Sequence, residues 1–330
     1  MPLNSSARHW TGIFPPLVTP LSGADQLDVA GLERLIEHVL SGSVHGLFVL
    51  GTTGEGPALS YRLRRELIER TLRQVDERVP VLVGITDTAT KEMASLAVYA
   101  AERGAEALVL APPYYFPNTQ PELLEYFRRT ARALPAPVFL YNMPTHTKTH
   151  IEIETVRRAF DEPNIAGIKD SSGNMVYFHR LVALAAQHGK RPVFMGPEEL
   201  LGESVLFGGS GGVSGGANLF PRLYVEIFEA AQDGRLGRVR QLHDLVMKIS
   251  CSLYQLSSYG SGFLKGLKCA LGLRGLCADG LADPSESFAG ADVERVRRLL
   301  DSLSGEVEQA LGDTAEAGLL AISEFVSTTA

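Results

Sequence analysis

The short apolar run Ile165-Ala166-Gly167-Ile168 is followed at once by Lys169. A run of this kind, bounded by longer amphipathic segments, is typical of a buried strand in a parallel sheet. The loop Gly51-Thr52-Thr53-Gly54-Glu55 and the residue Tyr141 each follow an apolar run in the same way. Because the carboxyl ends of parallel strands meet at one edge of a sheet, we expect these polar groups to lie together, as the residues of an active site do.

A short apolar run, a turn and an amphipathic segment follow one another eight times between residues 13 and 233. This alternation predicts parallel strands joined by right-handed helical crossovers. Eight such units in about 220 residues favour an α/β fold of the closed (β/α)8 TIM-barrel type, with an eight-stranded doubly wound sheet as the alternative. The predicted strands are residues 13–18, 46–50, 81–83, 107–110, 138–141, 165–169, 193–195 and 211–214.

Helix-start residues precede several of the amphipathic segments. Asp28, Ser60 and Thr90 stand before segments 29–40, 61–78 and 91–103, and Pro121 opens a fourth segment that ends at residue 133. The side-chain oxygens of Asp, Ser and Thr can accept hydrogen bonds from the free N–H groups of a first helical turn, and proline suits that turn.

No strand pattern follows residue 233, and segments 236–256, 263–271 and 293–311 have helical spacing of their apolar residues. The sequence therefore predicts a barrel over residues 11–233 that carries the active site, and a C-terminal helical domain over residues 234–330.

The composition argues against several classes of partner. A net charge of -7 leaves no broad basic surface for nucleic acid. No apolar run approaches the length of a membrane span, and the first ten residues lack the apolar core of a signal peptide. The three cysteines, Cys251, Cys269 and Cys277, have neither zinc-site spacing nor an even number, which favours reduced thiols. We expect a soluble cytoplasmic protein.

Lys169 suits the role of an amine nucleophile. Side chains alternate along a strand, so Gly167 and Lys169 share a face and the glycine leaves room for the lysine stem. Burial favours the neutral amine, which attacks a ketone and forms a Schiff base. The alternative is a lysine that reaches solvent or pairs with Asp170.

Tyr141 and the glycine-rich loop extend this chemistry. A phenol beside the amine can donate a proton and then accept one, although a strand-end tyrosine with a hydrated hydroxyl is also common. The loop over residues 51–56 offers backbone N–H groups and two hydroxyls to an anion, most simply a substrate carboxylate. It has neither the Walker pattern nor a Rossmann fingerprint.

Five motifs in order carry a resemblance to a known family. They are Gly51-Thr52-Thr53-Gly54-Glu55, Pro113-Tyr114-Tyr115, Tyr141-Asn142-Met143-Pro144, Gly167-Ile168-Lys169-Asp170, and Gly196 with Glu198 and Glu199. Over residues 11–275 the chain resembles the dihydrodipicolinate synthase and N-acetylneuraminate lyase superfamily. The resemblance implies a TIM barrel with a C-terminal helical domain, and a class I lyase or aldolase that forms a lysine Schiff base with pyruvate or another 2-keto acid. It implies no metal and no other cofactor.

The resemblance also implies roles for individual residues. Lys169 matches the Schiff-base lysine, Tyr141 the proton-transferring phenol, and Thr52 the hydroxyl of the proton relay. Thr52 and Thr53 together match the site of the keto-acid carboxylate. Tyr115 matches a tyrosine that reaches the site of a neighbouring subunit, which implies a homo-oligomer such as a dimer or a dimer of dimers.

Substrate choice is where this chain departs from the synthases. His146 stands where a synthase has an arginine that pairs with the carboxylate of the second substrate, and histidine lacks that bidentate fork. Lys148 stands where a glycine is often found, and either replaces the lost charge or faces solvent. In the sugar-acid branches of the family, a further set of residues lines the hydroxylated part of the substrate. The matching residues in this chain are Ser171, Gly196, Glu198, Glu199, Val213 and Gly215. Alternatively, the two glutamates only complement the dipole of a helix N-terminus.

The sequence thus favours an enzyme that makes or breaks the bond next to a keto-acid carbonyl through a Lys169 iminium. A 2-keto-3-deoxy sugar acid is the expected substrate, with aldol cleavage or dehydration on the same scaffold. One alternative is a 4-hydroxy-tetrahydrodipicolinate synthase, which condenses pyruvate with aspartate semialdehyde. Another is a non-catalytic keto-acid-binding protein.

Overall fold

Eight parallel strands form one sheet in the order β1-β10-β9-β8-β7-β6-β5-β4. The computed structural model describes residues 10–256 and 261–327, with side chains up to residue 312. The two outer strands meet, because Pro16 forms a parallel bridge with Phe48 and the Leu17 N–H donates to the Phe48 carbonyl at 2.9 Å. The sheet is therefore closed, which confirms the predicted barrel and excludes the doubly wound alternative.

The first and the last strand of the barrel, in chain order, are shorter than the sequence predicts. Their bounds are β1 Gly12–Ile13, β4 Leu47–Val49, β5 Val81–Gly84, β6 Ala107–Leu110, β7 Val138–Asn142, β8 Ile165–Asp170, β9 Val193–Met195 and β10 Gly211–Gly212. A small antiparallel hairpin, β2 Leu21–Gly23 and β3 Gln26–Leu27, follows β1. Pro15 and Pro16 shorten β1, since proline cannot donate to a strand ladder.

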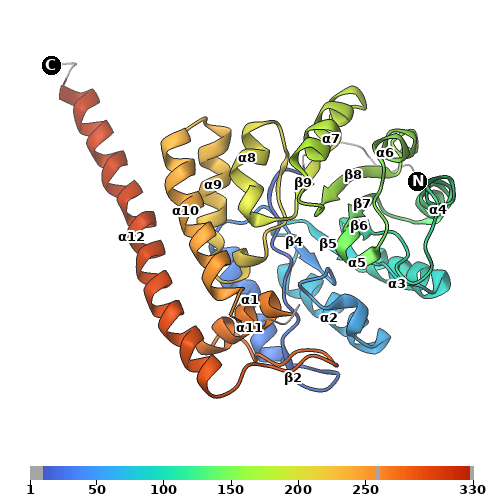
Figure 1. The fold of residues 1–330 in the computed structure, drawn as a ribbon, viewed down its shortest axis with the longest axis horizontal. Coiled ribbons are helices and arrows are strands. Elements are labelled where there is room, and N and C mark those ends of the chain that lie inside the picture. Colours follow the sequence, from blue (N-terminus) through green and yellow to red (C-terminus); the bar gives the residue numbers. More distant parts are fainter. Residues whose placement is uncertain (1–9, 257–260, 328–330) are drawn as a thin grey trace.

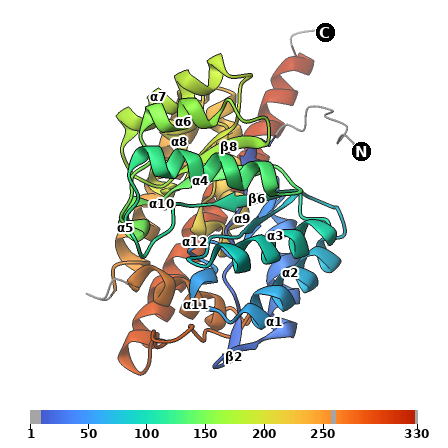
Figure 2. The same ribbon diagram turned by 90° about the vertical axis from the view of Figure 1, so that its right-hand side faces the viewer.

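Each barrel strand is followed by a helix on the outside of the barrel (Figures 1 and 2). These helices are α1 Val29–Ser41, α2 Tyr61–Val75, α3 Thr90–Glu102, α4 Gln120–Ala133, α6 Ile153–Ala159, α7 Met175–Gln187, α8 Leu201–Leu206 and α9 Pro221–Gln232. Four short helical turns lie in the loops: η1 Gly56–Ala58, α5 Pro144–Thr147, η2 Glu198–Leu200 and η3 Gly215–Asn218. The loops after β4 and β7 thus each carry a short turn at the carboxyl end of the barrel.

The helix starts agree with the sequence in part. Asp28 accepts from the Gly31 N–H at 2.9 Å, and Ser60 accepts from the Leu63 N–H at 3.2 Å, as caps of α1 and α2. Thr90 is not a cap, because it is already the first residue of α3. Helix α2 ends at Val75 rather than residue 78, since the two residues after it have positive φ angles of 46° and 59°.

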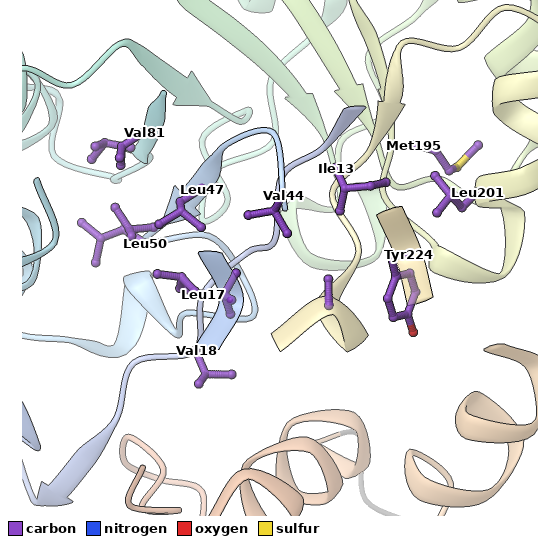
Figure 3. Close-up of a cluster of buried hydrophobic side chains, with 14 of the residues drawn as sticks. Ile13, Leu17, Val18, Val44, Leu47, Leu50, Val81, Met195, Leu201 and Tyr224 are labelled. Carbon is purple, nitrogen blue, oxygen red and sulfur yellow. The ribbon is translucent and has the colours of Figure 1, made fainter. Parts of the chain in front are cut away.

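Two groups of apolar side chains form the core. The inside of the barrel holds aromatic rings, with centroids 5.1 Å apart for Phe14 and Phe194 and 5.9 Å apart for Phe139 and Phe194. The larger group fills the space between the strands and the helices, and Figure 3 shows the part around Ile13 and Leu47. Each large side chain buried in this way stabilises the fold by about 1.5–3 kcal/mol.

Gly167 lies against an aromatic ring inside the barrel. A Cβ atom at this position would lie 2.6 Å from Cε1 of Phe139 and 2.5 Å from the Pro192 carbonyl oxygen. The glycine therefore accommodates the Phe139 ring inside the barrel, and space for the Lys169 stem stays a prediction.

Three helices follow the barrel: α10 Leu236–Leu253, α11 Gly262–Leu273 and α12 Ala291–Ser327. Helix α12 runs along the outside of α10, and its last turns extend beyond the rest of the molecule (Figure 1). Its inner face is a buried apolar stripe of Val296, Leu300, Leu303, Val307 and Ala310. The predicted boundary at residues 233 and 234 falls between α9 and α10 and stays a prediction; residues 328–330 lie outside the described part of the chain.

Candidate active site

Lys169 and Tyr141 lie side by side at the carboxyl ends of β8 and β7. The register of the two strands pairs their Cα positions directly. The Lys169 Nζ atom lies 4.2 Å from the centroid of the Tyr141 ring and 5.3 Å from that of Phe48, and the side chain is only 7% exposed. The amine is thus held between two aromatic rings rather than in solvent.

Asp170 does not neutralise this lysine. Its carboxylate accepts hydrogen bonds from the Asn142 amide at 2.8 Å and from the Ser172 hydroxyl at 2.9 Å. Asp170 is fully buried, and burial raises the pKa of its carboxyl group above the usual value. Both alternatives for Lys169, exposure to solvent and pairing with Asp170, therefore disagree with the structure.

Tyr141 is hydrogen-bonded to the glycine-rich loop after β4. Its hydroxyl lies 3.2 Å from Oγ1 of Thr52, and either oxygen can donate. Burial alone raises the pKa of Tyr141, but the nearby Lys169 charge and hydrogen bonds from Thr52 and Ser171 outweigh it, so the pKa of the phenol is lowered. A phenol of this kind can pass a proton between a bound substrate and the Thr52 hydroxyl.

A cavity of about 540 Å³ opens at the carboxyl ends of the strands beside Thr52 and Tyr141, and Lys169 itself is not among its lining residues. Phe48 and Tyr141, the rings beside the amine, line it together with Thr52. Other lining residues come from the loops after β5, β6 and β7 and from the chain after α11; among them are Thr86, Tyr114, Met143, Thr145 and the segment 282–285. The cavity is large enough for a small organic acid.

A buried ion pair ties the C-terminal region to the glycine-rich loop. Nζ of Lys268 on α11 lies 2.6 Å from Oε1 of Glu55 and donates to the Thr19 carbonyl at 2.8 Å. The second Glu55 oxygen accepts from the Ala282 N–H at 2.7 Å. Glu55 and Ala282 both line the cavity, so this pair fixes one of its walls next to Thr52.

Comparison with known proteins agrees with this geometry. The model of the dihydrodipicolinate synthetase family matches residues 9–302. The chain belongs to the dihydrodipicolinate synthetase family. It is therefore an enzyme of this family, a lyase, and the predicted resemblance is confirmed.

Relatives within the dihydrodipicolinate synthetase family differ in the reactions their names give. The dihydrodipicolinate synthase of Bacteroides thetaiotaomicron is 49% identical, with a TM-score of 0.86 over 88% of this chain and 98% of that one. A 4-hydroxy-tetrahydrodipicolinate synthase of Ralstonia nicotianae is 31% identical over 88% of this chain and 96% of its own length.

A third relative is YagE of Escherichia coli, named provisionally as a 2-dehydro-3-deoxy-D-gluconate aldolase, which is 32% identical over 76% of this chain and 83% of its own. YagE has been solved in complex with pyruvate, with a TM-score of 0.84 at 30% identity over 90% of this chain and 99% of that one.

Some of the other residues predicted from the family line the cavity and others do not. His146 and Lys148 line the cavity, whereas Thr53 is buried and is not among the lining residues. A Cβ atom on Gly196 would lie 1.9 Å from the Ser171 hydroxyl oxygen, and Ser171 is one of the residues that lower the pKa of Tyr141. Gly196 therefore keeps space for Ser171 beside the phenol.

Val213 and Gly215 contribute to packing. Val213 belongs to the apolar group inside the barrel, and a Cβ atom on Gly215 would lie 2.4 Å from the Phe263 ring. Neither is among the residues that line the cavity. Both remain substrate-binding residues only as predictions from the resemblance.

Glu198 and Glu199 point away from the cavity. Glu198 is buried and accepts from the Tyr224 hydroxyl at 2.5 Å, the Gly216 N–H at 2.6 Å and the Tyr254 hydroxyl at 3.1 Å. The Ser250 hydroxyl donates to Glu199. These contacts join η2 to α9 and α10, so the carboxylates are occupied by the protein itself rather than presented to sugar hydroxyls.

The Glu198 carboxyl makes the stability of the fold depend on pH. Burial raises its pKa from 4.5 to about 7, and the hydrogen bonds from Tyr224 and Gly216 only partly oppose this. The folded protein therefore binds this proton more tightly than the unfolded chain. The resulting stabilisation is present below about pH 4.5 and is lost as the pH rises through 7, a change of about 3 kcal/mol.

Glu198→Gln is expected to reduce that loss, because the amide resembles the protonated carboxyl in shape and carries no charge. Denaturant unfolding at pH 5 and pH 8 measures the free energy of unfolding of both proteins. We expect the difference between the two pH values to shrink by about 2–3 kcal/mol in the variant. An identical difference in the two proteins would show that Glu198 does not titrate in this range.

Tyr115 is not among the residues that line the cavity of its own chain. It is 77% exposed and packs edge-to-face on Phe116, which is 75% exposed, with ring centroids 5.0 Å apart. Tyr114, the residue before it, lines the cavity instead. Within the motif Pro113-Tyr114-Tyr115, Tyr114 thus lines the cavity and Tyr115 lies at the surface.

The described residues show neither a metal-binding group nor a membrane helix. No cluster of three or more His, Cys, Asp or Glu side chains in this part of the chain could hold a metal ion. None of the described helices is both long and apolar enough to cross a bilayer.

Proposed function

We propose that this enzyme cleaves or forms the C3–C4 bond of a 2-keto acid, one carbon away from the keto group, through a Schiff base on Lys169. The observation that carries the proposal is the register of β7 and β8, which sets the Tyr141 ring 4.2 Å from the lysine amine. The substrate class is a 2-keto-3-deoxy sugar acid, with pyruvate as the three-carbon fragment. Dehydration of such an acid is possible through the same iminium.

The proposed reaction follows from the two side chains. The Lys169 amine adds to the keto carbon and water leaves, which gives an iminium. The Tyr141 phenolate takes the proton of the substrate C4 hydroxyl while the C3–C4 bond breaks, and the bonding electrons move into the iminium to give an enamine. An aldehyde leaves, the enamine is protonated at C3, and water releases pyruvate and the free amine. Thr52 passes protons to and from Tyr141.

Reductive trapping tests this proposal. Incubation with pyruvate and borohydride is expected to add one reduced pyruvyl group to Lys169, detected by the mass of the peptide that contains it. A chain that stays unmodified under these conditions would refute the Schiff base and favour a keto-acid-binding protein. Release of pyruvate from a panel of 2-keto-3-deoxy acids then identifies the substrate.

A second candidate function is the condensation of pyruvate with aspartate semialdehyde, because several relatives carry the name of that synthase. His146 argues against it. Burial and the nearby charge of Lys148 lower the pKa of His146, so the ring is neutral at pH 7 and offers no positive charge to a carboxylate. We therefore rank the sugar-acid reaction first.

His146→Arg is expected to raise kcat/KM for aspartate semialdehyde at least about tenfold, since an arginine can pair with its carboxylate in a bidentate way. Condensation with pyruvate measures this effect, and pyruvate trapping on Lys169 serves as the control that should not change. Fast condensation by the unchanged enzyme, with no gain from arginine, would instead establish the synthase function.

We also propose that the enzyme is a homo-oligomer, most simply a dimer of dimers. Exposed large apolar side chains support this: Tyr115 and Phe116 after β6, whose rings pack together, and Val176 on α7 and Phe207 after α8, which are 72% and 62% exposed. Surfaces of this kind are typical of subunit contacts. A monomeric mass by light scattering at micromolar concentration would contradict the proposal.

A cytoplasmic location is proposed from the thiols. Cys251, Cys269 and Cys277 are all free in the structure, and reduced cysteines are usual in that compartment. Recovery of the protein in a secreted or membrane fraction of its host would contradict this location.

A further inference from the structure

The ladder between β7 and β8 contains a β-bulge. Val138 pairs with Ile165, but the next residue of β7 pairs two positions further along β8, so Ala166 is an extra residue between them. An extra residue of this kind shifts the register of every pair that follows it. Tyr141 therefore pairs with Lys169 rather than with the residue before it.

This bulge also turns Lys169 toward the inside of the barrel. Ile165 and Ile168 both belong to the apolar group between the strands and the helices, although regular alternation places residues three apart on opposite faces. Ala166, between them, packs against the group inside the barrel instead. Without the extra residue, position 169 would share the outer face of Ile165.

A side-chain hydrogen bond joins the two strands just beyond the reacting residues. Asn142 and Asp170 are the next pair in the shifted register, and both are fully buried. The Asn142 amide donates to Oδ1 of Asp170 at 2.8 Å. The backbone continues the ladder here, since the Asn142 carbonyl accepts from the Ser171 N–H at 2.8 Å. A slip of either strand by one residue would separate the two side chains.

Both members of this pair are also tied to the segments that lead into α6 and α7. Oδ1 of Asn142 accepts from the Ile151 N–H at 3.0 Å, and its amide nitrogen lies 3.3 Å from Nδ1 of His150. Asp170 accepts from the N–H and the hydroxyl of Ser172 at 3.1 and 2.9 Å. All four polar side-chain atoms of the pair are thus occupied by the protein itself, which fixes their orientation.

We propose that Asn142 and Asp170 are positioning residues, which hold the shifted register and so keep the Tyr141 phenol beside the Lys169 amine. Neither is among the residues that line the cavity, so they act through Tyr141 rather than on the substrate. This inference rests on the proposed function, in which Tyr141 moves the substrate proton. A displacement of about 1 Å between reacting groups costs about 10²-fold in rate. Loss of the pair should therefore slow C–C cleavage and leave binding of the keto acid nearly unchanged.

Asp170→Ala tests the hydrogen bond between the strands. We expect the single-turnover rate of cleavage to fall by about 10- to 100-fold. The pyruvate concentration that half-saturates borohydride trapping on Lys169 should stay within about twofold, because the loss falls on the transition state. Asp170→Asn keeps an oxygen that accepts from the Asn142 amide, and should retain the rate within about threefold.

Ser172→Ala is the matched control. It removes a hydrogen bond of 2.9 Å to the same carboxylate, but one that lies within a single segment and does not join the two strands. The rate should stay within about twofold of the unchanged enzyme. A loss in Asp170→Asn as large as that in Asp170→Ala would overturn the inference, since the charge of the carboxylate would then be what matters.

Tyr141→Phe separates positioning from a general structural role. If the pair acts through the phenol, adding Asp170→Ala to Tyr141→Phe should slow cleavage by less than about threefold, because the hydroxyl that it positions is already gone. The same factor with and without the phenol would show that the pair acts by another route, and would also overturn the inference.

An exchange of the two side chains provides the test if Asp170→Ala does not fold. Asn142→Asp places two carboxylates side by side and is expected to slow cleavage about tenfold or more. Adding Asp170→Asn restores one amide and one carboxylate in reversed order, and should recover most of that loss. Equal rates with and without this second change would contradict the inference. None of these results touches the Schiff base, whereas failure to trap pyruvate in the unchanged enzyme would refute the proposed function itself.

Discussion

Lys169→Ala is expected to lower turnover on the order of 10⁶-fold, the scale seen when the nucleophile of other covalent enzymes is removed. The reason is that the amine forms the bond to the keto carbon, and alanine has no group that can do so. Tyr141 and Thr52 stay in place in this variant but have no iminium to act on. Pyruvate release from the best substrate of the panel measures the loss.

The fold should tolerate this substitution. Lys169 makes no ion pair with Asp170, so its removal leaves no charged partner unpaired within the described residues. We expect the free energy of unfolding to change by about 1–3 kcal/mol. The borohydride adduct should disappear together with the activity. Turnover near that of the unchanged enzyme would exclude an iminium on Lys169, whatever the stability of the variant.

Tyr141→Phe is expected to slow turnover by roughly 10²- to 10⁴-fold, because it removes the hydroxyl that moves the substrate proton while the ring stays in place. The amine keeps its aromatic neighbour, so pyruvate should still be trapped, although more slowly. The variant thus separates binding of the keto acid from cleavage of its C–C bond. Single-turnover measurement of the cleavage step gives the size of the effect.

Tyr126→Phe is the matched control for Tyr141→Phe. Tyr126 is a buried tyrosine on α4 whose hydroxyl has no hydrogen-bond partner among the described residues. The same chemical change there should leave the rate within about twofold of the unchanged enzyme. If Tyr141→Phe also left the rate unchanged, the phenol would have no part in proton transfer.

The sequence predicts that Lys169 and Tyr141 lie together, because their placement depends on local rules. Both end apolar runs of strand length, and neighbouring parallel strands bring such ends together. The register that pairs their Cα positions also depends on the extra residue Ala166, which the pattern does not reveal. The closed barrel is predicted for the same reason, since it needs only the order and number of the strands.

Contacts between distant parts of the chain could not be read from the pattern. Glu198 follows a proline and resembles a residue that faces a ligand, but its partner Tyr224 lies on α9 and its partner Tyr254 directly follows α10. The segment 282–285 lines the cavity although it has no motif of its own. In each case the deciding contact joins residues far apart in sequence, which local spacing does not encode.

The ion pair between Glu55 and Lys268 limits how this scaffold can be shortened. A chain cut before α11 would leave the Glu55 carboxylate sequestered without its cationic partner, a defect of about 3–5 kcal/mol located three residues from Thr52. Such a chain would also lack Ala282, whose N–H donates to Glu55, and the part of the cavity wall that Ala282 forms. A shortened or transplanted version of this barrel must therefore keep the C-terminal region that contains α11 and Ala282.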